Sequence, residues 1–117
     1  REAVVGDVRD CDHLSRQMRA HSPDIVFHAA AIKHVPMAER NVGQAVLTNV
    51  LGSRNVADMC AAHGVATLVQ ISTDKAVNPT SIMGASKRIA EIYAQAFAQQ
   101  AASTTRIITV RFGNVLG

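Results

Sequence analysis

The sequence predicts an α/β protein with a parallel β-sheet, and two observations predict it. Four short runs of β-branched and apolar residues recur along the 117 residues, and none alternates clearly between polar and apolar positions. Continuous apolar runs are typical of parallel strands that are buried on both faces. Helix-like segments separate the runs, so strands and helices alternate along the chain. We therefore expect parallel strands joined by right-handed helical crossovers.

The predicted strands are the apolar runs themselves, at residues 3–8, 25–31, 67–72 and 106–112. β-Branched side chains fit the pleated surface of a sheet, which favours extended structure in each run. The predicted helices occupy the segments between the runs, at residues 12–19, 37–62 and 81–102.

The second predicted helix carries a stripe with the three-and-four spacing of one buried helix face. The stripe consists of Val42, Ala45, Val46, Asn49, Val50, Ser53, Val56, Ala57 and Cys60. Asn49 therefore faces inward, where an unpaired amide would cost about 1–3 kcal/mol, so it must bond to a strand backbone or to a ligand. After this helix, Gly64 can adopt the left-handed conformation that ends a helix.

The third predicted helix has its own apolar stripe, which we expect to face the core. The stripe consists of Ile82, Ala85, Ile89, Ile92, Tyr93, Ala96 and Phe97. Tyr93 belongs to this stripe, so we interpret it as a packing residue rather than a catalytic phenol. Met83 and Lys87 stand four residues apart on an adjacent face, which we expect to point elsewhere.

The composition excludes several classes of function. Twelve basic and nine acidic residues are scattered along the chain, and one Tyr, three Phe and no Trp offer little surface for stacking bases. We therefore expect no nucleic-acid partner, and a small acidic ligand suits the charge better. Cys11 and Cys60 form no C-x-x-C pair, so neither a zinc site nor a disulfide framework is indicated. No apolar run approaches the ~20 residues of a membrane span, so we expect this segment to be soluble.

Open parallel sheets bind ligands just beyond the carboxyl ends of their strands, so the residues after each run are the candidates. Asp7 follows the first run and could accept a hydrogen bond from an adenine amino group. An Asp in such a turn also commonly bonds its own backbone. Ala29, Ala30 and Ala31 leave the second run, and their small side chains would let a flat ligand approach the backbone closely.

The third run ends in the most reactive cluster of the sequence. Ser72, Thr73, Asp74 and Lys75 place two hydroxyls, a carboxyl and an amine in four residues. An adjacent carboxyl and amine can share protons as a coupled pair, which suits acid–base catalysis, although a solvated surface ion pair is the alternative. Lys87 could contact a ribose or phosphate, and a solvent-exposed side chain is its alternative.

Together these elements resemble the extended short-chain dehydrogenase/reductase family over nearly the whole chain. In that family the strand-end Asp of a G-D-x-x-D stretch contacts adenine, and small residues at a strand end lie against the dinucleotide. A Y-x-x-x-K pair works beside the nicotinamide. Lys87 matches the Lys of that pair, whereas Met83 stands where the family has its catalytic Tyr. A thioether has no acidic proton, so Met83 cannot relay one.

Four separated motifs look more specifically like the large, membrane-associated nucleotide-sugar 4,6-dehydratases of the CapD polysaccharide-biosynthesis type. That subgroup carries Met at this position and typically acts on UDP-N-acetylglucosamine. The matching segments are residues 28–31 with 33–36, 72–79, 83–88 and 111–117. Four matches in register are far more specific than any single motif.

The resemblance implies a set of site residues. The implied catalytic residues are Thr73, Asp74, Lys75, Met83 and Lys87; Lys75 would be the base at C5 of the sugar, Asp74 the acid at the C6 hydroxyl, and Thr73 would hold the C4 oxygen. The implied cofactor is NAD, with NADP as the alternative, and its binding residues are Asp7, Val8, Ala29, Ala30, Ala31, Asn49, Ser72 and Lys87. The implied contacts to a UDP-sugar are Lys33, His34, Arg111 and Asn114.

The resemblance also predicts the domain organisation. Residues 1–117 would form part of a Rossmann-like, doubly wound parallel sheet, truncated at both ends, without the first two strands and the C-terminal substrate region. The four runs would be strands 3, 4, 5 and 6 of the order 3-2-1-4-5-6, so the missing strands would separate the first run from the others. We expect this chain alone to be inactive and prone to associate.

The same resemblance implies a cytoplasmic domain of a homo-oligomeric protein associated with the bacterial inner membrane, through segments outside this chain. Two other functions stay open. A nucleotide-sugar epimerase of the same family needs no acid at C6 and normally retains the Tyr. A non-catalytic dinucleotide-binding sensor would account for Met83.

Overall fold

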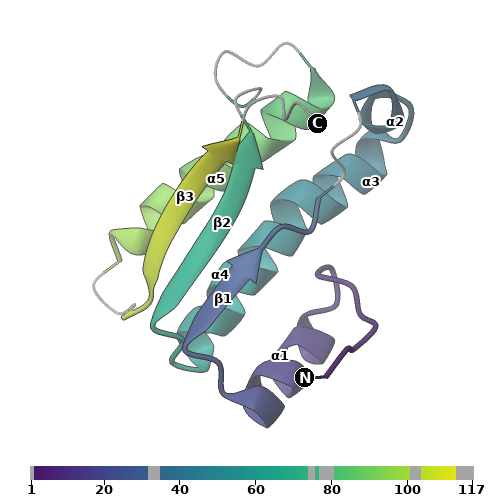
Figure 1. Ribbon diagram of the computed structural model, residues 1–117. Coiled ribbons are helices and arrows are strands. Elements are labelled where there is room, and N and C mark those ends of the chain that lie inside the picture. The colour runs from purple at the N-terminus through teal and green to yellow at the C-terminus, as the bar shows by residue number, and fades with distance from the viewer. Residues whose placement is uncertain (1, 32–34, 74–75, 77–80, 101–103, 113–117) are drawn as a thin grey trace.

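The computed structural model describes residues 2–31, 35–73, 76, 81–100 and 104–112. Within them, three strands form one parallel sheet in the order β1–β2–β3, as Figure 1 shows. The strands are β1 (Ile25–His28), β2 (Thr67–Thr73) and β3 (Arg106–Phe112). Both pairings are parallel. The predicted parallel α/β architecture is confirmed for these strands.

The helices connect the strands and cover one face of the sheet. They are α1 (Cys11–His21), α2 (Val35–Arg40), α3 (Val42–Val46), the π-helical turn η1 (Leu47–Leu51), α4 (Gly52–Ala62) and α5 (Ile82–Ala98). Two of them begin where a side chain caps free backbone N–H groups. Asp10 accepts from the His13 N–H at the start of α1, and Ser81 accepts from the Gly84 N–H at the start of α5.

The predicted single helix over residues 37–62 is wrong in detail, because the helix is interrupted at Asn41. Its side-chain amide donates to the Met37 carbonyl, and its own carbonyl accepts from Ala45 N–H. Asn41 thus ends α2 and begins α3. Asn side chains compete with the helix for backbone partners in this way, which periodicity alone does not reveal.

The main core lies between the sheet and the helices. It contains Met18, Val56, Ala57, Cys60, Val65, Leu68 and Phe97. On β2, Leu68, Gln70 and Ser72 are buried and alternate with half-buried residues, so one face of the strand turns toward α4 and α5. The inward stripe of the second predicted helix is confirmed from Ala45 to Cys60, except that Val46 is exposed, as is Val42 before it.

Two predictions about the sheet are wrong for the described residues. Residues 3–8 form no strand, and Val5 is 99% exposed. A strand needs a neighbour for its backbone N–H and C=O groups, and within the described part of the chain none pairs with this segment. The sheet is also covered by helices on one face rather than two, so Phe27 on β1 is 71% exposed.

The predicted core stripe of α5 is confirmed only in part: Phe97 is buried, and Ile82 and Tyr93 pack against core clusters. Ile89 and Ile92 are half exposed, whereas Met83, Lys87, Ala90, Glu91 and Ala94 are among the buried residues. The reason is that the strand ends offer polar partners to charged side chains on that face, as described below. Burying Lys and Glu is tolerated where such partners exist.

Two local predictions are confirmed. Gly64 has φ +70°, in the left-handed region. Tyr93 packs its ring against Phe97 at 6.0 Å between centroids and donates to Asp58 at 2.7 Å. Burial and the Asp58 carboxylate raise the pKa of Tyr93 to about 12, which suits a packing residue. Cys11 and Cys60 are free thiols.

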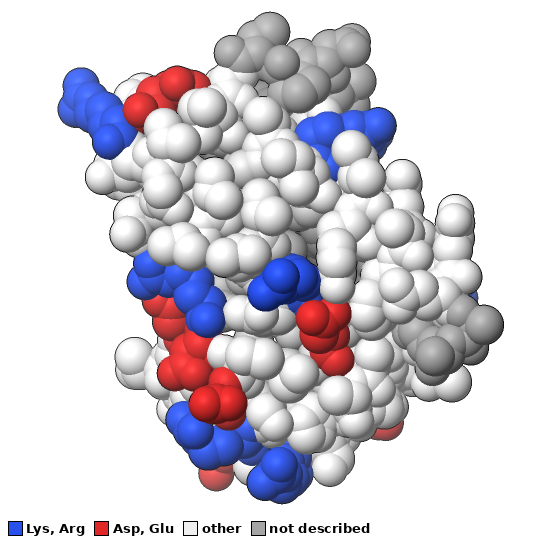
Figure 2. Space-filling view, turned by 180° about the vertical axis from the view of Figure 1, so that it is seen from behind, with Lys and Arg blue, Asp and Glu red and all other residues white. Residues whose placement is uncertain are grey.

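The helix side of the molecule carries charges of both signs. Figure 2 shows this side, where basic and acidic side chains lie interspersed rather than gathered in a stripe of one sign. Among the described residues, no helix is both long and apolar enough to cross a membrane.

Candidate functional site

The candidate site is the edge of the sheet where the parallel strands end. The arrowheads of β1, β2 and β3 point the same way in Figure 1, so the residues after them share one edge. The last strand residues are His28, Thr73 and Phe112. This edge is where open parallel sheets bind their ligands.

Three predicted cofactor-binding residues meet in one hollow beside β1. Val8, Ala29 and Ala30 line a cavity of about 170 Å³ together with apolar residues of α1, α4 and β1. Val8 approaches α4 closely because residue 52 is a glycine: a Cβ there would lie 2.6 Å from Val8 Cγ2. Ala29 and Ala30 are exposed.

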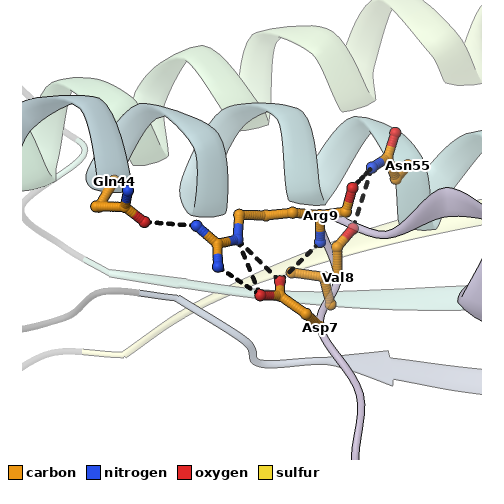
Figure 3. A network of polar contacts seen from close by, with 5 residues as sticks. All are labelled: Asp7, Val8, Arg9, Gln44 and Asn55. Atoms are coloured by element: carbon orange, nitrogen blue, oxygen red, sulfur yellow. Dashed lines mark hydrogen bonds and ion pairs between the residues drawn. The ribbon is translucent and has the colours of Figure 1, made fainter.

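Asp7 is exposed and its carboxylate is fixed by Arg9, as Figure 3 shows. It accepts from the Arg9 backbone N–H at 2.9 Å and from the Arg9 guanidinium at 2.6–3.1 Å. These hydrogen bonds lower the pKa of Asp7, so it is ionised at neutral pH. Asp7 therefore makes a hydrogen bond to the backbone of its own turn, which was the alternative to an adenine contact.

The turn around Asp7 is anchored to α3 and α4. Arg9 donates onward to Gln44 Oε1, and Asn55 donates to the carbonyl oxygens of Val8 and Arg9 at 3.1 and 3.2 Å (Figure 3). Asp7 and Val8 also line a wider hollow of about 580 Å³ beside α1. The turn thus presents an ionised carboxylate next to open space.

Lys87 and Met83 lie on the buried face of α5, contrary to the expectation that this face points elsewhere. Lys87 is 4% exposed and its Nζ donates to the Ile71 carbonyl oxygen at 3.0 Å. The solvent-exposed alternative for Lys87 is therefore wrong. Met83 is 3% exposed and packs in a small cluster with Ala38, Ala45 and Ile82.

Ser72 and Arg111 meet at a residue that the sequence analysis missed. Glu91 on α5 accepts from Ser72 Oγ at 2.6 Å and from Arg111 Nε at 3.0 Å. Burial alone would raise the pKa of Glu91, but hydrogen bonds from Arg111 and Ser72 outweigh it and lower the pKa. Glu91 stands four residues after Lys87, and that spacing on a helix is the signal that could have found it.

Asn49 lies on the π-helical turn η1 and is fully buried, as predicted. Its Nδ2 donates to Ser86 Oγ at 2.9 Å, and Ser86 donates to the Met83 carbonyl. This hydrogen bond brackets η1 to α5, a helix-to-helix contact that the sequence analysis did not foresee. π-Helical turns often occur at functional sites.

A second buried contact joins β1 to α4. His28 Nε2 lies 3.0 Å from Ser53 Oγ, and Ser53 donates its only proton to the Asn49 carbonyl at 2.8 Å. His28 Nε2 must therefore be the donor of that contact. Burial and the positive charge of Lys87 lower the pKa of His28 to about 4, so the ring is neutral at pH 7.

Two of the remaining predicted site residues lie in the described part of the chain. Thr73 ends β2 and is half-buried, and Ala31 follows β1 and is half-buried as well. The other predicted residues lie outside the described part of the chain: Lys33, His34, Asp74, Lys75 and Asn114. The structure therefore gathers Ser72, Thr73, Lys87 and Arg111 around the end of β2.

The family model of polysaccharide biosynthesis proteins matches residues 1–117. The chain belongs to this family. The capsular polysaccharide biosynthesis protein CapD of Staphylococcus aureus is 46% identical over 114 residues, covering 97% of this chain and 19% of CapD. A UDP-N-acetylglucosamine 4,6-dehydratase (inverting) of Campylobacter jejuni is 43% identical over 114 residues, covering 97% of this chain and 34% of that enzyme. The resemblance to the CapD type is confirmed.

Solved structures of similar fold support the same assignment for this polysaccharide biosynthesis family chain. A Pen protein from Bacillus thuringiensis superposes with a TM-score of 0.93 and 38% identity, covering 99% of this chain and 36% of that one. The UDP-glucose 4-epimerase of Thermus thermophilus, solved in complex with NAD, gives a TM-score of 0.88 and 28% identity, covering 96% and 40%. The predicted Rossmann-like fold is confirmed, and the chain spans between 19% and 40% of the length of these four proteins.

Proposed function

We propose that the protein containing this chain is a nucleotide-sugar 4,6-dehydratase that converts UDP-N-acetylglucosamine to its 4-keto-6-deoxy derivative for surface polysaccharide synthesis. The observation that carries the proposal is the position of Lys87, buried against Ile71 beside Ser72 and Thr73 at the end of β2. Lys87 thereby adjoins the strand end that leads directly into Asp74 and Lys75. The 43% identity to a UDP-N-acetylglucosamine 4,6-dehydratase supports the choice of substrate.

The described residues fit a dinucleotide cofactor, which we propose to be NAD, with NADP as the alternative. The exposed Ala29 and Ala30 leave room at the end of β1, and the ionised Asp7 offers acceptors for an amino group. The residues that would hold NAD are those predicted from the sequence: Asp7, Val8, Ala29, Ala30, Ala31, Asn49, Ser72 and Lys87. When bound, NAD supplies the removal of a hydride from C4 and its return to C6.

The side chains after β2 would carry the proton transfers. Once C4 is a ketone, the C5 hydrogen is acidic, and Lys75 would remove that proton and return it to C5 when the hydride adds to C6. Asp74 would protonate the departing C6 hydroxyl and take the earlier proton of the C4 hydroxyl, while Thr73 would hold the C4 oxygen. Met83 would take no part in proton transfer, because its thioether has no acidic proton and packs between Ala38 and Ala45.

The proposed substrate contacts are Lys33, His34, Arg111 and Asn114, whose amine, imidazole, guanidinium and amide groups suit a sugar diphosphate. Arg111 already pairs with Glu91, so it would contact the substrate with the part of its guanidinium that faces away from that carboxylate. We also propose a homo-oligomer on the cytoplasmic side of a bacterial inner membrane, on the strength of the family resemblance.

The test uses the full-length protein with UDP-N-acetylglucosamine and a catalytic amount of NAD. We expect mass spectrometry to find a sugar nucleotide lighter by one water, with no net formation of NADH. The Asp74→Asn variant should bind the sugar but turn over at least about 100-fold more slowly. Asp58→Asn is the matched control, because Asp58 lies on α4 and accepts from Tyr93.

Two results would count against the proposal. An isomer of unchanged mass would favour a nucleotide-sugar epimerase, the second candidate, which the likeness to an NAD-bound UDP-glucose 4-epimerase supports. Near-normal turnover by Asp74→Asn would refute the role of Asp74 as the acid and leave the overall reaction standing.

A further inference from the structure

One buried carboxylate joins three elements at the candidate site. Glu91 of α5 is 1% exposed and accepts from Ser72 on β2 and from Arg111 on β3. Arg88, one turn earlier on the same helix, adds a contact of 3.3 Å. Glu91 has no role in the catalytic and binding set proposed above, yet its partners include two members of that set.

The contacts of Glu91 and Lys87 fall on consecutive residues of β2. Lys87 donates to the carbonyl of Ile71, and Glu91 accepts from the hydroxyl of Ser72. These residues directly precede Thr73, the last residue of β2. Helix α5 is therefore held to the strand at two adjacent points, just where the proposed catalytic residues begin.

The charge of Glu91 makes the loss of any of these hydrogen bonds costly. A buried carboxylate is strongly destabilising unless its oxygens are paired, and here the hydroxyl of Ser72 and the guanidinium of Arg111 pair them. Both partners project from strand ends, so the rotation of α5 and the positions of both strand ends are fixed together. A small displacement of any one of them breaks a contact to a buried charge.

We infer that Glu91 is a positioning residue of the proposed dehydratase: it holds Ser72 at the end of β2, and through α5 it holds Lys87, in the geometry that turnover requires. This inference rests on the proposed function. Glu91 acts through Ser72, Lys87 and Arg111 rather than by contacting substrate. The alternative is that its contacts only stabilise the fold.

The experiment compares Glu91→Gln and Ser72→Ala in the full-length protein with Tyr93→Phe as the control. Tyr93→Phe also removes a hydrogen-bonding group from α5, but one that joins α5 to α4 through Asp58 at 2.7 Å. Steady-state kcat and KM are measured with UDP-N-acetylglucosamine, and the Kd of NAD is measured by calorimetry. Ser72→Thr, which keeps a hydroxyl, is the conservative variant.

We expect Glu91→Gln and Ser72→Ala to lower kcat by about 10- to 100-fold, because misplacement by about 1 Å can cost that much. In Glu91→Gln, KM and the Kd of NAD should stay within about twofold, since Glu91 belongs to neither the proposed NAD contacts nor the proposed substrate contacts. Ser72→Ala also removes a proposed NAD contact, so its kcat is compared at saturating NAD. Tyr93→Phe should keep kcat within about twofold of wild type, and Ser72→Thr should recover most of the rate lost by Ser72→Ala.

Three results would overturn the inference. The first is an unchanged kcat in Ser72→Ala and in a folded Glu91→Gln. The second is an unchanged kcat of Ser72→Ala at saturating NAD with a weaker Kd of NAD, which would leave Ser72 a cofactor contact with no positioning role. The third is an equal loss of kcat in Tyr93→Phe, which would show that any loosening of α5 has the same effect. If Glu91→Gln fails to fold, Ser72→Ala and Ser72→Thr decide.

A wild-type protein that turns over no UDP-sugar would refute the proposed function separately. Amide hydrogen exchange then tests whether the contact between Ser72 and Glu91 holds the end of β2, because it needs no turnover. Faster exchange of the peptide covering residues 67–73 in Ser72→Ala than in Tyr93→Phe would support it, and equal exchange would overturn it.

Discussion

His28 illustrates how a single buried side chain ties the site to the pH of the solution. It ends β1, is 4% exposed, and donates to Ser53 while Lys87 stands near enough to disfavour a second positive charge. Burial and Lys87 together lower its pKa from an ordinary 6.5 to about 4. The folded protein therefore holds His28 neutral over a range where the unfolded chain protonates it.

We predict that His28 makes the domain less stable as the pH falls from about 6.5 to about 4. In this window the unfolded chain binds a proton that the folded chain does not, so the free energy of unfolding decreases, by at most about 3 kcal/mol. Above pH 6.5 the contribution is complete and constant. Thermal unfolding at several pH values should show a shallower acid dependence in His28→Asn than in wild type. Equal slopes in the two proteins would contradict this prediction.

At the residue scale, sequence patterns located side chains better than they identified their partners. The inward position of Asn49 follows from helical spacing alone, whereas its bond to Ser86 joins residues 37 positions apart. Glu91 was missed because it lies outside the predicted apolar stripe, where a charged residue is ordinarily assigned to the surface. Only the meeting of Ser72 and Arg111 at the strand ends makes its burial favourable.

At the scale of the element, the π-helical turn η1 is the feature that brings an amide to α5. Leu47–Leu51 interrupts the helix between α3 and α4, and Asn49 projects from it into the contact with Ser86. Ser53, one turn later, donates back to the Asn49 carbonyl. The side chain and backbone of Asn49 thus serve two different contacts, and the wider turn accommodates both.

We predict that Asn49→Ala lowers the free energy of unfolding by about 1–3 kcal/mol, because the buried Ser86 hydroxyl loses its donor. Asn41→Ala is the matched control. It removes an exposed side-chain bond to the Met37 carbonyl, which should cost less than about 1 kcal/mol. Urea unfolding monitored by circular dichroism compares the two variants. Equal destabilisation would show that the bracket between η1 and α5 contributes no more than a surface contact.

The elements themselves were predicted unevenly, for physical reasons. The run at residues 106–112 matches β3, because a continuous β-branched run has few alternatives. The orientation of α5 was predicted only in part: Phe97 is buried as expected, whereas Ile89 and Ile92 are half exposed. Hydrophobicity alone cannot foresee that Lys87 and Glu91 find partners on the sheet.

For the whole molecule, the parallel sheet explains why the candidate residues meet. β1, β2 and β3 run in one direction, so segments far apart in sequence reach the same edge (Figure 1). Alternation of strands and helices predicts that much from the sequence. It does not predict the exposed Phe27 and Val5, because an apolar run shows that residues are extended and not which face or edge of the sheet is covered.

The most direct measurement follows a deuterium atom placed at C4 of UDP-N-acetylglucosamine through turnover by the full-length protein. A 4,6-dehydratase moves the hydride within one sugar. NMR should therefore find the label in the C6 methyl group of a product that carries a ketone at C4. Deuterium that remains at C4, in an isomer of the substrate, would contradict the dehydratase and identify an epimerase instead.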